Sequence, residues 1–150
     1  MILNFFFSNL QKYILKPEKT LTRHPILFYD SDCVLCSQSV RWLVLCNKKG
    51  KVKISSLSSQ AAKALEHEFK WIDSVVFYYD GKFAVKSAAI SELCFHLGFP
   101  FRFIGWFIRI IPAVWADLLY DFVAKNRFRW FGRTNKCRLP SATEKEMFLS

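Results

Sequence analysis

Apolar positions along the chain recur with two different periods, which together predict a mixed α/β fold. Short runs rich in β-branched and aromatic residues indicate four strands, at 26–30, 52–56, 74–79 and 82–86. Apolar residues three or four positions apart predict helices at 37–46, 60–69, 88–97 and 101–111, and one more that begins at Pro112. The order of elements is therefore strand, helix, strand, helix, strand, strand, helix, followed by two further helices.

The residues that connect these elements support the same order. Asp80-Gly81 separates the third and fourth strands and predicts a two-residue type I′ hairpin, so these strands should pair antiparallel. Gly50 is suited to end one helix, while Ser58 or Ser59 and Ser87 are suited to cap the helices that follow them. With a right-handed crossover, we expect a thioredoxin-like four-stranded mixed sheet flanked by helices, with a C-terminal helical extension.

We expect one domain built from three parts. Residues 1–24 form an N-terminal extension, either docked or frayed or an amphipathic helix. Residues 25–98 form the thioredoxin-like core, and residues 99–150 form a helical cap and a basic tail of the same domain.

The helical cap is expected to be buried. The helix at 101–111 is apolar on nearly all sides, which favours burial under its neighbours. In the next helix we expect an ion pair between Asp121 and Lys125, four residues apart. The expected core stripe of that helix consists of Trp115, Leu118, Leu119 and Phe122.

Composition limits the classes of function. With 150 residues, 52% of them hydrophobic and 23% charged, the chain can bury a core and is not of the disordered class. Five cysteines, an odd number in a chain that needs no disulfide staples, favour a reducing compartment, so we expect a cytoplasmic protein. The apolar start of the chain lacks the features of a secretory signal, and no uncharged apolar run reaches the roughly 18 residues of a spanning helix. Peripheral membrane contact through residues 3–15 is the alternative.

Candidate chemistry lies where the first strand gives way to the first helix. Cys33 and Cys36 stand there three residues apart, close to Asp30 and Asp32. A sulfur in the first turn of a helix faces unpaired backbone N–H groups and the positive end of the helix dipole, which stabilise a thiolate. Cys36, Val40, Leu43 and Val44 have the spacing of a buried helix face. We therefore predict Cys33 as an exposed, attacking thiol and Cys36, on this buried face, as the resolving thiol. Asp30 and Asp32 either tune the thiol, move a proton or cap the helix, and capping is the prediction for Asp32.

A structural zinc site is the main alternative for this CxxC motif. Structural zinc takes four Cys or His ligands, commonly as two pairs, and the sequence has no second CxxC, CxxH or HxxxH motif. Cys46 and Cys94 fall on apolar helix faces and are predicted to be core residues. The spacing of His24, His67 and His96 suggests no catalytic pair, and a glycine-rich nucleotide loop is absent from the sequence, so we expect no metal and no cofactor.

Three blocks of the sequence resemble one family, the DCC family of thiol-disulfide oxidoreductases. They are Phe-Tyr-Asp-Ser-Asp-Cys-Val-Leu-Cys at 28–36, Lys-Ser-Ala-Ala-Ile at 86–90, and Ala-Lys-Asn-Arg-Phe-Arg-Trp-Phe-Gly at 124–132 with Cys-Arg-Leu-Pro at 137–140. The resemblance implies a thioredoxin-like domain with disulfide-exchange activity. It places the family's Asp-Cys-x-x-Cys signature on Asp32, Cys33 and Cys36, and its preceding aspartate on Asp30.

These observations predict an enzyme, a thiol-disulfide oxidoreductase that acts through a mixed disulfide. Its partners would be a disulfide-containing protein or a small thiol as substrate, and an external dithiol or reductase as electron donor. Two features differ from ordinary thioredoxins. Val34-Leu35 separates the cysteines, and no proline precedes the strand at 74, where thioredoxins carry a cis-proline that orients an extended substrate. Folded disulfide proteins are therefore not assumed to be the substrate.

Charge supports a second hypothesis, a binding module with a structural CxxC. The chain has 22 Lys and Arg against 12 Asp and Glu, a net charge of +10 that attracts anionic partners. Residues 125–138 interleave six cations with Phe128, Trp130 and Phe131, a pattern suited to an anionic membrane or to nucleic acid. Because no nucleic-acid module accompanies it, we expect no nucleic acid, and at most weak membrane contact. Alternatively, this block packs near the sulfurs.

Cys137, in the same tail, leaves three interpretations open. It is a third redox thiol that approaches Cys33 and Cys36, a zinc ligand together with a histidine, or a thiol without a chemical role.

Overall fold

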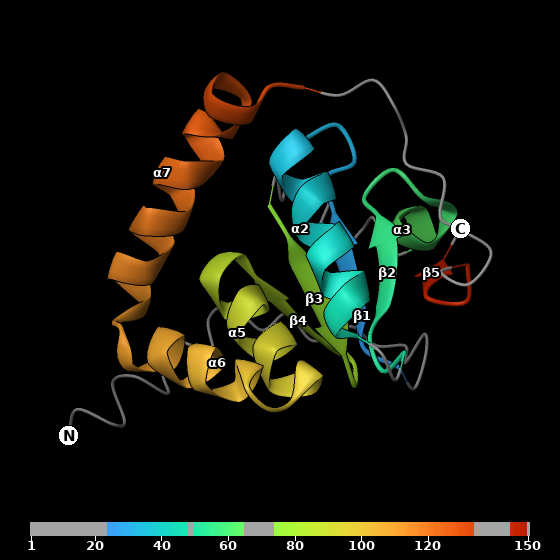
Figure 1. The fold of residues 1–150 in the computed structure, drawn as a ribbon, viewed down its shortest axis with the longest axis horizontal. Helices are drawn as coiled ribbons and strands as arrows, with labels where there is room; N and C mark the ends of the chain where they lie inside the picture. Colours follow the sequence, from blue (N-terminus) through green and yellow to red (C-terminus); the bar gives the residue numbers. More distant parts are fainter. Residues whose placement is uncertain (1–23, 48–49, 65–73, 134–144, 150) are drawn as a thin grey trace.

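The computed structural model describes residues 24–47, 50–64, 74–133 and 145–149, in which helices cover a central sheet (Figure 1). The strands are β1 (Ile26–Tyr29), β2 (Lys53–Ser56), β3 (Val76–Tyr79), β4 (Lys82–Val85) and β5 (Phe148–Leu149). The helices are α2 (Val34–Cys46), α3 (Gln60–Ala64), α5 (Lys86–Leu97), α6 (Phe101–Ile110) and α7 (Ala113–Phe131).

The sheet confirms the predicted thioredoxin-like arrangement and adds one strand to it. Its order is β4-β3-β1-β2-β5, in which β1 and β2 run parallel and the β3–β4 hairpin runs antiparallel to β1. The fifth strand pairs parallel with β2, where the Ile54 N–H donates to the Met147 carbonyl at 2.7 Å. This addition covers an edge whose backbone groups would otherwise lack sheet partners. A two-residue strand leaves no periodic signal in the sequence, so it was not predicted.

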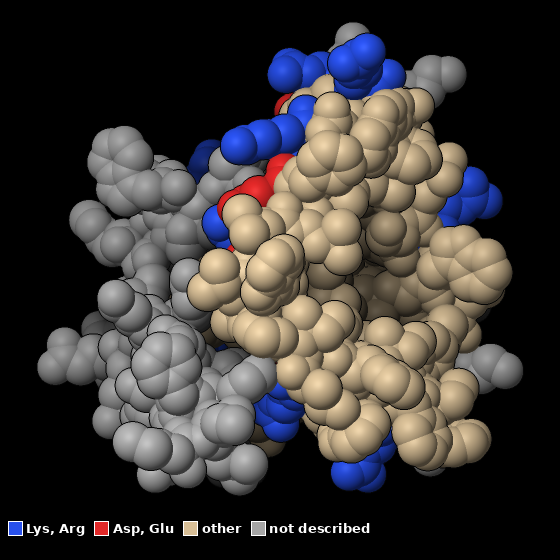
Figure 2. Space-filling view, turned by 90° about the vertical axis from the view of Figure 1, so that its left-hand side faces the viewer, with Lys and Arg blue, Asp and Glu red and all other residues tan. Residues whose placement is uncertain are grey.

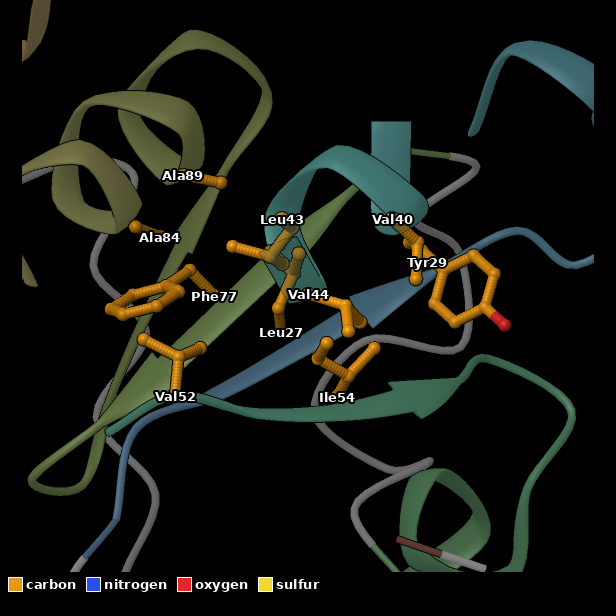
Figure 3. Packing of buried hydrophobic residues seen from close by; sticks show 10 residues of the cluster. All are labelled: Leu27, Tyr29, Val40, Leu43, Val44, Val52, Ile54, Phe77, Ala84 and Ala89. Atoms are coloured by element: carbon orange, nitrogen blue, oxygen red, sulfur yellow. The ribbon is translucent and has the colours of Figure 1, made fainter. Parts of the chain in front are cut away.

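The period-two alternation of β1 builds a core on both faces of the sheet. Leu27 and Tyr29 pack with α2 and α5, while Ile26 and Phe28 pack on the other face, where Ala62 of α3 lies. One row of the first face runs across all five strands: Leu27 lies opposite both Ile54 and Phe77, which in turn lie opposite Phe148 and Ala84. Figure 3 shows this cluster. Each such side chain contributes about 1.5–3 kcal/mol by leaving water, which fixes β1 and the start of α2 relative to each other.

The predicted Asp80-Gly81 turn and Ser59 cap are confirmed, whereas α2 ends before Gly50, with Asn47 as its C-cap. Asp80 and Gly81 both have positive φ, at 49° and 71°, as a type I′ hairpin requires. Ser59 caps α3, since its hydroxyl accepts the Ala62 N–H at 3.1 Å. The prediction for Ser87 was wrong, because α5 begins at Lys86, two residues before the predicted start, and its cap residue is Val85. The Ser87 hydroxyl donates instead to Asp117 of α7.

Helices α6 and α7 follow the predicted boundaries but not the predicted burial. Gly105 lets α6 lie close against α5, because a Cβ there would stand 3.0 Å from the Ser91 carbonyl oxygen. Most of the other α6 side chains are exposed, and so are Trp115, Leu118 and Phe122, which were expected in the core. The expected partner of Asp121 was also wrong, because Asp121 pairs with Lys86 of α5 at 2.9 Å. Helical periodicity identified an apolar stripe on α7, and the structure turns all four of its residues outward, Leu119 included.

Candidate active site at the start of helix α2

The Cys33 sulfur occupies the N-cap position of α2. Its backbone is extended, with φ −97° and ψ 122°, and its Sγ accepts the Cys36 N–H at 3.4 Å. Sulfur thus takes the place of the oxygen that a Ser or Asp would offer to the first free N–H groups of the helix. This geometry lets a helix amide and the helix dipole stabilise negative charge on Cys33.

The two cysteines differ in exposure, in the opposite order to the one predicted. Cys33 is fully buried, at 0% exposed, and its backbone forms an isolated antiparallel bridge with Arg133. Cys36 is half-buried. The stripe of Val40, Leu43 and Val44 is buried as predicted. The sequence pattern missed the burial of Cys33, and the bridge shows that residues as far as 100 positions along the chain lie beside it.

A buried ion pair lies beside the sulfurs. The Arg127 Nη2 of α7 donates to the Asp30 Oδ2 at 2.8 Å, and the Arg127 Nη1 lies 3.8 Å from the Cys36 Sγ. Arg127 is 4% exposed, and its guanidinium also stacks on the Phe128 ring at 4.7 Å. Burial of a charge is expensive unless it is paired, so this pair holds α7 firmly against the loop that follows β1.

The two aspartates have different roles. The Asp30 Oδ1 accepts the Asp32 N–H at 2.9 Å, a local turn that shapes the loop before Cys33, while Asp30 Oδ2 binds Arg127. Asp32 is exposed, and its Oδ1 accepts from the Ser31 hydroxyl at 3.5 Å. The prediction that Asp32 caps α2 was wrong, because the cap is Cys33 itself.

The surroundings of Cys36 favour its neutral thiol. Burial raises the pKa of Cys36 from 9.0 to about 12, with further increases from the hydrogen bond and charge of Cys33 and from the charge of Asp30. The Arg127 guanidinium acts in the opposite direction and lowers the pKa of Cys36. Near neutral pH Cys36 is therefore protonated, and Arg127 is the group that favours its ionisation.

A pocket of about 480 Å³ adjoins Cys36. Its walls come from α2, α5, α6, α7 and the sheet, and they are mostly aliphatic. The side chains Asp30, Cys36 and Arg127 belong to the same lining. An apolar chamber that holds a few polar and ionisable groups has the character of a small-molecule or side-chain binding site.

The backbone beside β3, where thioredoxins carry the cis-proline, is bonded internally. The Val75 N–H donates to the Tyr120 hydroxyl of α7 at 3.0 Å, and the Val75 carbonyl accepts the Lys86 N–H at 3.3 Å. Burial raises the pKa of Tyr120, so its hydroxyl is neutral at physiological pH. Both backbone groups of Val75 are therefore bonded within the protein.

Among the described residues, the other cysteines and His96 lie in surroundings that indicate packing. Cys94 is buried as predicted, and Cys46 is half-buried. The ring of His96 packs against Phe77 and Tyr79. Cys137, His67 and the N-terminal extension at 1–23 lie outside the described residues.

The zinc alternative gains no ligands from the described part of the chain. Within it, no group of three or more His, Cys, Asp or Glu side chains lies close enough to hold a metal ion.

Arg127 is the functional residue that sequence reasoning did not single out. It was counted only as one of six cations in the stretch 125–138. The sequence did contain one indication of its role. Arg127 belongs to the third block of the family resemblance, and packing of that block near the sulfurs was one of the alternatives predicted for it. The structure shows this packing, with Arg127 and Arg133 contacting the CxxC region.

Comparison with known proteins bears directly on this arrangement. Residues 27–133 match the family model described as DCC1-like thiol-disulfide oxidoreductase. The chain belongs to this family. Membership supports a general thiol-disulfide redox role, and the matched range includes both cysteines, Asp30 and Arg127.

Two relatives agree with this assignment. An uncharacterized protein of Bacillus subtilis (strain 168), YuxK, is 34% identical over 128 residues, which cover 83% of this chain and 93% of that protein. A chloroplastic DCC family protein of Arabidopsis thaliana is 29% identical over 121 residues, 78% of this chain and 70% of that protein. No solved structure matches the chain significantly.

Proposed function

We propose that the protein catalyses thiol-disulfide exchange, with Cys33 as the attacking thiol and Cys36 as the resolving thiol. The observation that carries the proposal is the position of the Cys33 Sγ at the N-cap of α2, where it accepts the Cys36 N–H at 3.4 Å. In this position a helix N–H donates to the sulfur that attacks the substrate. The position also keeps Cys36 within one helical turn, as the second step of exchange requires.

The reaction proceeds in two substitutions at sulfur. The Cys33 thiolate attacks a substrate disulfide, the substrate S–S bond breaks, and one half departs as a thiolate that takes a proton from water. Cys36 then attacks the Cys33 sulfur, the mixed S–S bond breaks, and the other half departs as a thiolate that takes up the proton given up by Cys36, which leaves a Cys33–Cys36 disulfide. The substrate gains two electrons and the pair loses two, which an external dithiol or reductase returns.

The different surroundings of the two sulfurs support this order of events. The raised pKa of Cys36 keeps it protonated near neutral pH, so it does not compete in the first attack. Its ionisation is needed only in the second step, and Arg127, 3.8 Å from its Sγ, stabilises the resulting thiolate. Asp30 is a positioning residue, because it holds Arg127 in place by the ion pair.

The substrate we propose is a small disulfide or one flanked by apolar groups. Cys33 is fully buried, which restricts access by the surface of a folded protein. The backbone groups of Val75 are already bonded, and the pocket beside Cys36 is mostly aliphatic. Recognition would therefore rest on apolar contact in the pocket rather than on strand-like pairing with a peptide.

Trapping of the mixed disulfide tests the proposal. The Cys36→Ser variant, incubated with glutathione disulfide, should accumulate one glutathione on Cys33, which intact-protein and peptide mass spectrometry would locate. Cys33→Ser should give no adduct, and Cys94→Ser, which alters a buried thiol outside the motif, should form the Cys33–Cys36 disulfide as the native protein does. An adduct on Cys36 in the Cys33→Ser variant would reverse the two roles. If no variant forms an adduct and the native pair never oxidises, the proposed function is wrong.

A further inference from the structure

Helices α6 and α7 expose a broad apolar surface, which we call the α6–α7 face. Figure 2 views the molecule from this side, and the face is mainly uncharged. Its most prominent side chains, each more than half exposed, are Phe103, Phe107, Trp115, Leu118, Leu119 and Phe122. Contiguous apolar surfaces of this kind are rare on monomers and mark sites of interaction.

Charges on the two helices are segregated around this face. The stretch 101–133 contains six Lys and Arg but only two acids, Asp117 and Asp121. Both acids turn toward α5, where Asp117 accepts from Ser87 and Asp121 pairs with Lys86. The exposed charges that remain on α6 and α7 are cations, among them Arg102, Lys125 and Arg129.

This combination is complementary to an anionic lipid bilayer. Apolar side chains enter the boundary between headgroups and acyl chains, while flanking cations bind lipid phosphates. A second copy of the chain complements it less well, because two such faces would bring like charges together on proteins of net charge +10. No single helix among the described residues is long and apolar enough to cross a membrane. The pair α6 and α7 meets that test only jointly and is bent by 113°, which suits helices that lie on a surface better than a straight span.

We propose that the α6–α7 face docks the protein on the surface of an anionic lipid bilayer. Two exposed residues at this face, Ile111 and Leu119, also line the pocket beside Cys36. Docking would therefore place the pocket next to the apolar phase of the membrane. The proposal is independent of the redox chemistry, since it rests on helices that carry neither cysteine of the motif.

Vesicle binding by the full chain tests this inference. The protein should sediment with vesicles of phosphatidylcholine containing about 30% phosphatidylglycerol, and bind less well in high salt or to phosphatidylcholine alone. The double variant Leu118→Asp/Phe122→Asp should lower the partition coefficient at least about tenfold, because it places two charges in the apolar part of the face. The matched control is Trp42→Asp, which alters an aromatic residue 71% exposed on α2 and should bind as the native chain does.

A second variant separates the electrostatic contribution. Lys125→Glu/Arg129→Glu should lower binding to the phosphatidylglycerol vesicles about tenfold or more and change binding to neutral vesicles little. Cys33→Ser should bind normally, which distinguishes this inference from the proposed function. Equal binding by the native chain and a folded Leu118→Asp/Phe122→Asp variant would overturn the inference. The inference would also be wrong if only removal of residues 1–23, and neither double variant, lowered vesicle binding. It would likewise be wrong if the native chain did not bind vesicles but formed a dimer in sedimentation velocity that the Leu118→Asp/Phe122→Asp variant abolished.

Discussion

The two sides of helix α7 use their side chains in contrasting ways. On the inner side, Arg127, Tyr120 and Asp117 each bond to a residue of another element. On the outer side, Trp115 and Phe122 are more than half exposed. The difference shows that the inner side fixes the helix against α5 and the CxxC loop, whereas the outer side adds little to folding. A stability defect should therefore follow changes on the inner side and in the core, and a recognition defect should follow changes on the outer side.

Two phenylalanines give the largest expected contrast. Phe77, 2% exposed, fills the first face of the sheet, whereas Phe122 lies on the outer side of α7. Phe77→Ala should lower the free energy of unfolding by about 3–5 kcal/mol, because it removes buried contacts and leaves a cavity. Phe122→Ala should change it by no more than about 0.5 kcal/mol. Urea unfolding followed by circular dichroism measures both, and similar losses would mean that the outer side contributes to the core.

Two arginines on α7 provide the next contrast. Arg127→Ala should cost about 2–3 kcal/mol of unfolding free energy, because Asp30 is left largely buried without its ion-pair partner. The exposed Arg129→Ala should cost no more than about 0.5 kcal/mol.

A double-mutant cycle would show whether the ion pair causes this loss. In the Asp30→Asn/Arg127→Ala variant the combined loss should be clearly smaller than the sum of the single losses. Arg127→Ala should also slow the release of the mixed disulfide from Cys33. Additive losses would place the origin of the effect outside the pair.

Alkaline pH should lower the free energy of unfolding through ionisation of Cys36. Its pKa is raised from 9.0 to about 12 in the folded chain, so the folded state holds the thiol proton more tightly than the unfolded state does. This stability is fully present below about pH 9 and is lost progressively as pH rises toward 12, about 1–2 kcal/mol of it by pH 10.5. Cys36→Ser should lose less stability than the native chain between about pH 8 and pH 10.5. In the Cys36→Ser variant the free energy of unfolding should still decrease somewhat with rising pH, because burial also raises the pKa of Tyr120 and of Cys94. Urea unfolding at several pH values measures this dependence. An equal decrease for the native chain and the variant would mean that Cys36 is not its cause.

Local patterns in the sequence predicted the parts of the fold that local forces determine. The strand β1, the Asp80-Gly81 turn and the stripe of Val40, Leu43 and Val44 each depend on neighbours in sequence, and each is found as predicted. The position of Cys33 and Cys36 at the start of a helix was also predicted from local sequence. Helix boundaries in the cap were predicted for the same reason.

Contacts between residues distant in sequence could not be predicted from local patterns. Arg133 forms a backbone bridge with Cys33 across 100 positions, and Arg127 reaches Asp30 across 97. The apolar stripe of α7 was equally visible in the sequence, but periodicity does not say whether such a stripe meets the core or solvent. Only the placement of α6 and α7 beside α5 decided that it is exposed.

The smallest expected effect concerns a partly exposed bond at the edge of the inner side. Asp121 pairs with Lys86 at 2.9 Å, and both side chains are about one-third exposed. Water screens such a pair, so Asp121→Asn should cost only about 0.5 kcal/mol of unfolding free energy, against the larger loss at Arg127. The variant should nevertheless keep its affinity for anionic vesicles, because Asp121 faces α5 and not the α6–α7 face. A marked loss of vesicle binding without a loss of stability would mean that the division between the two sides of α7 is drawn in the wrong place.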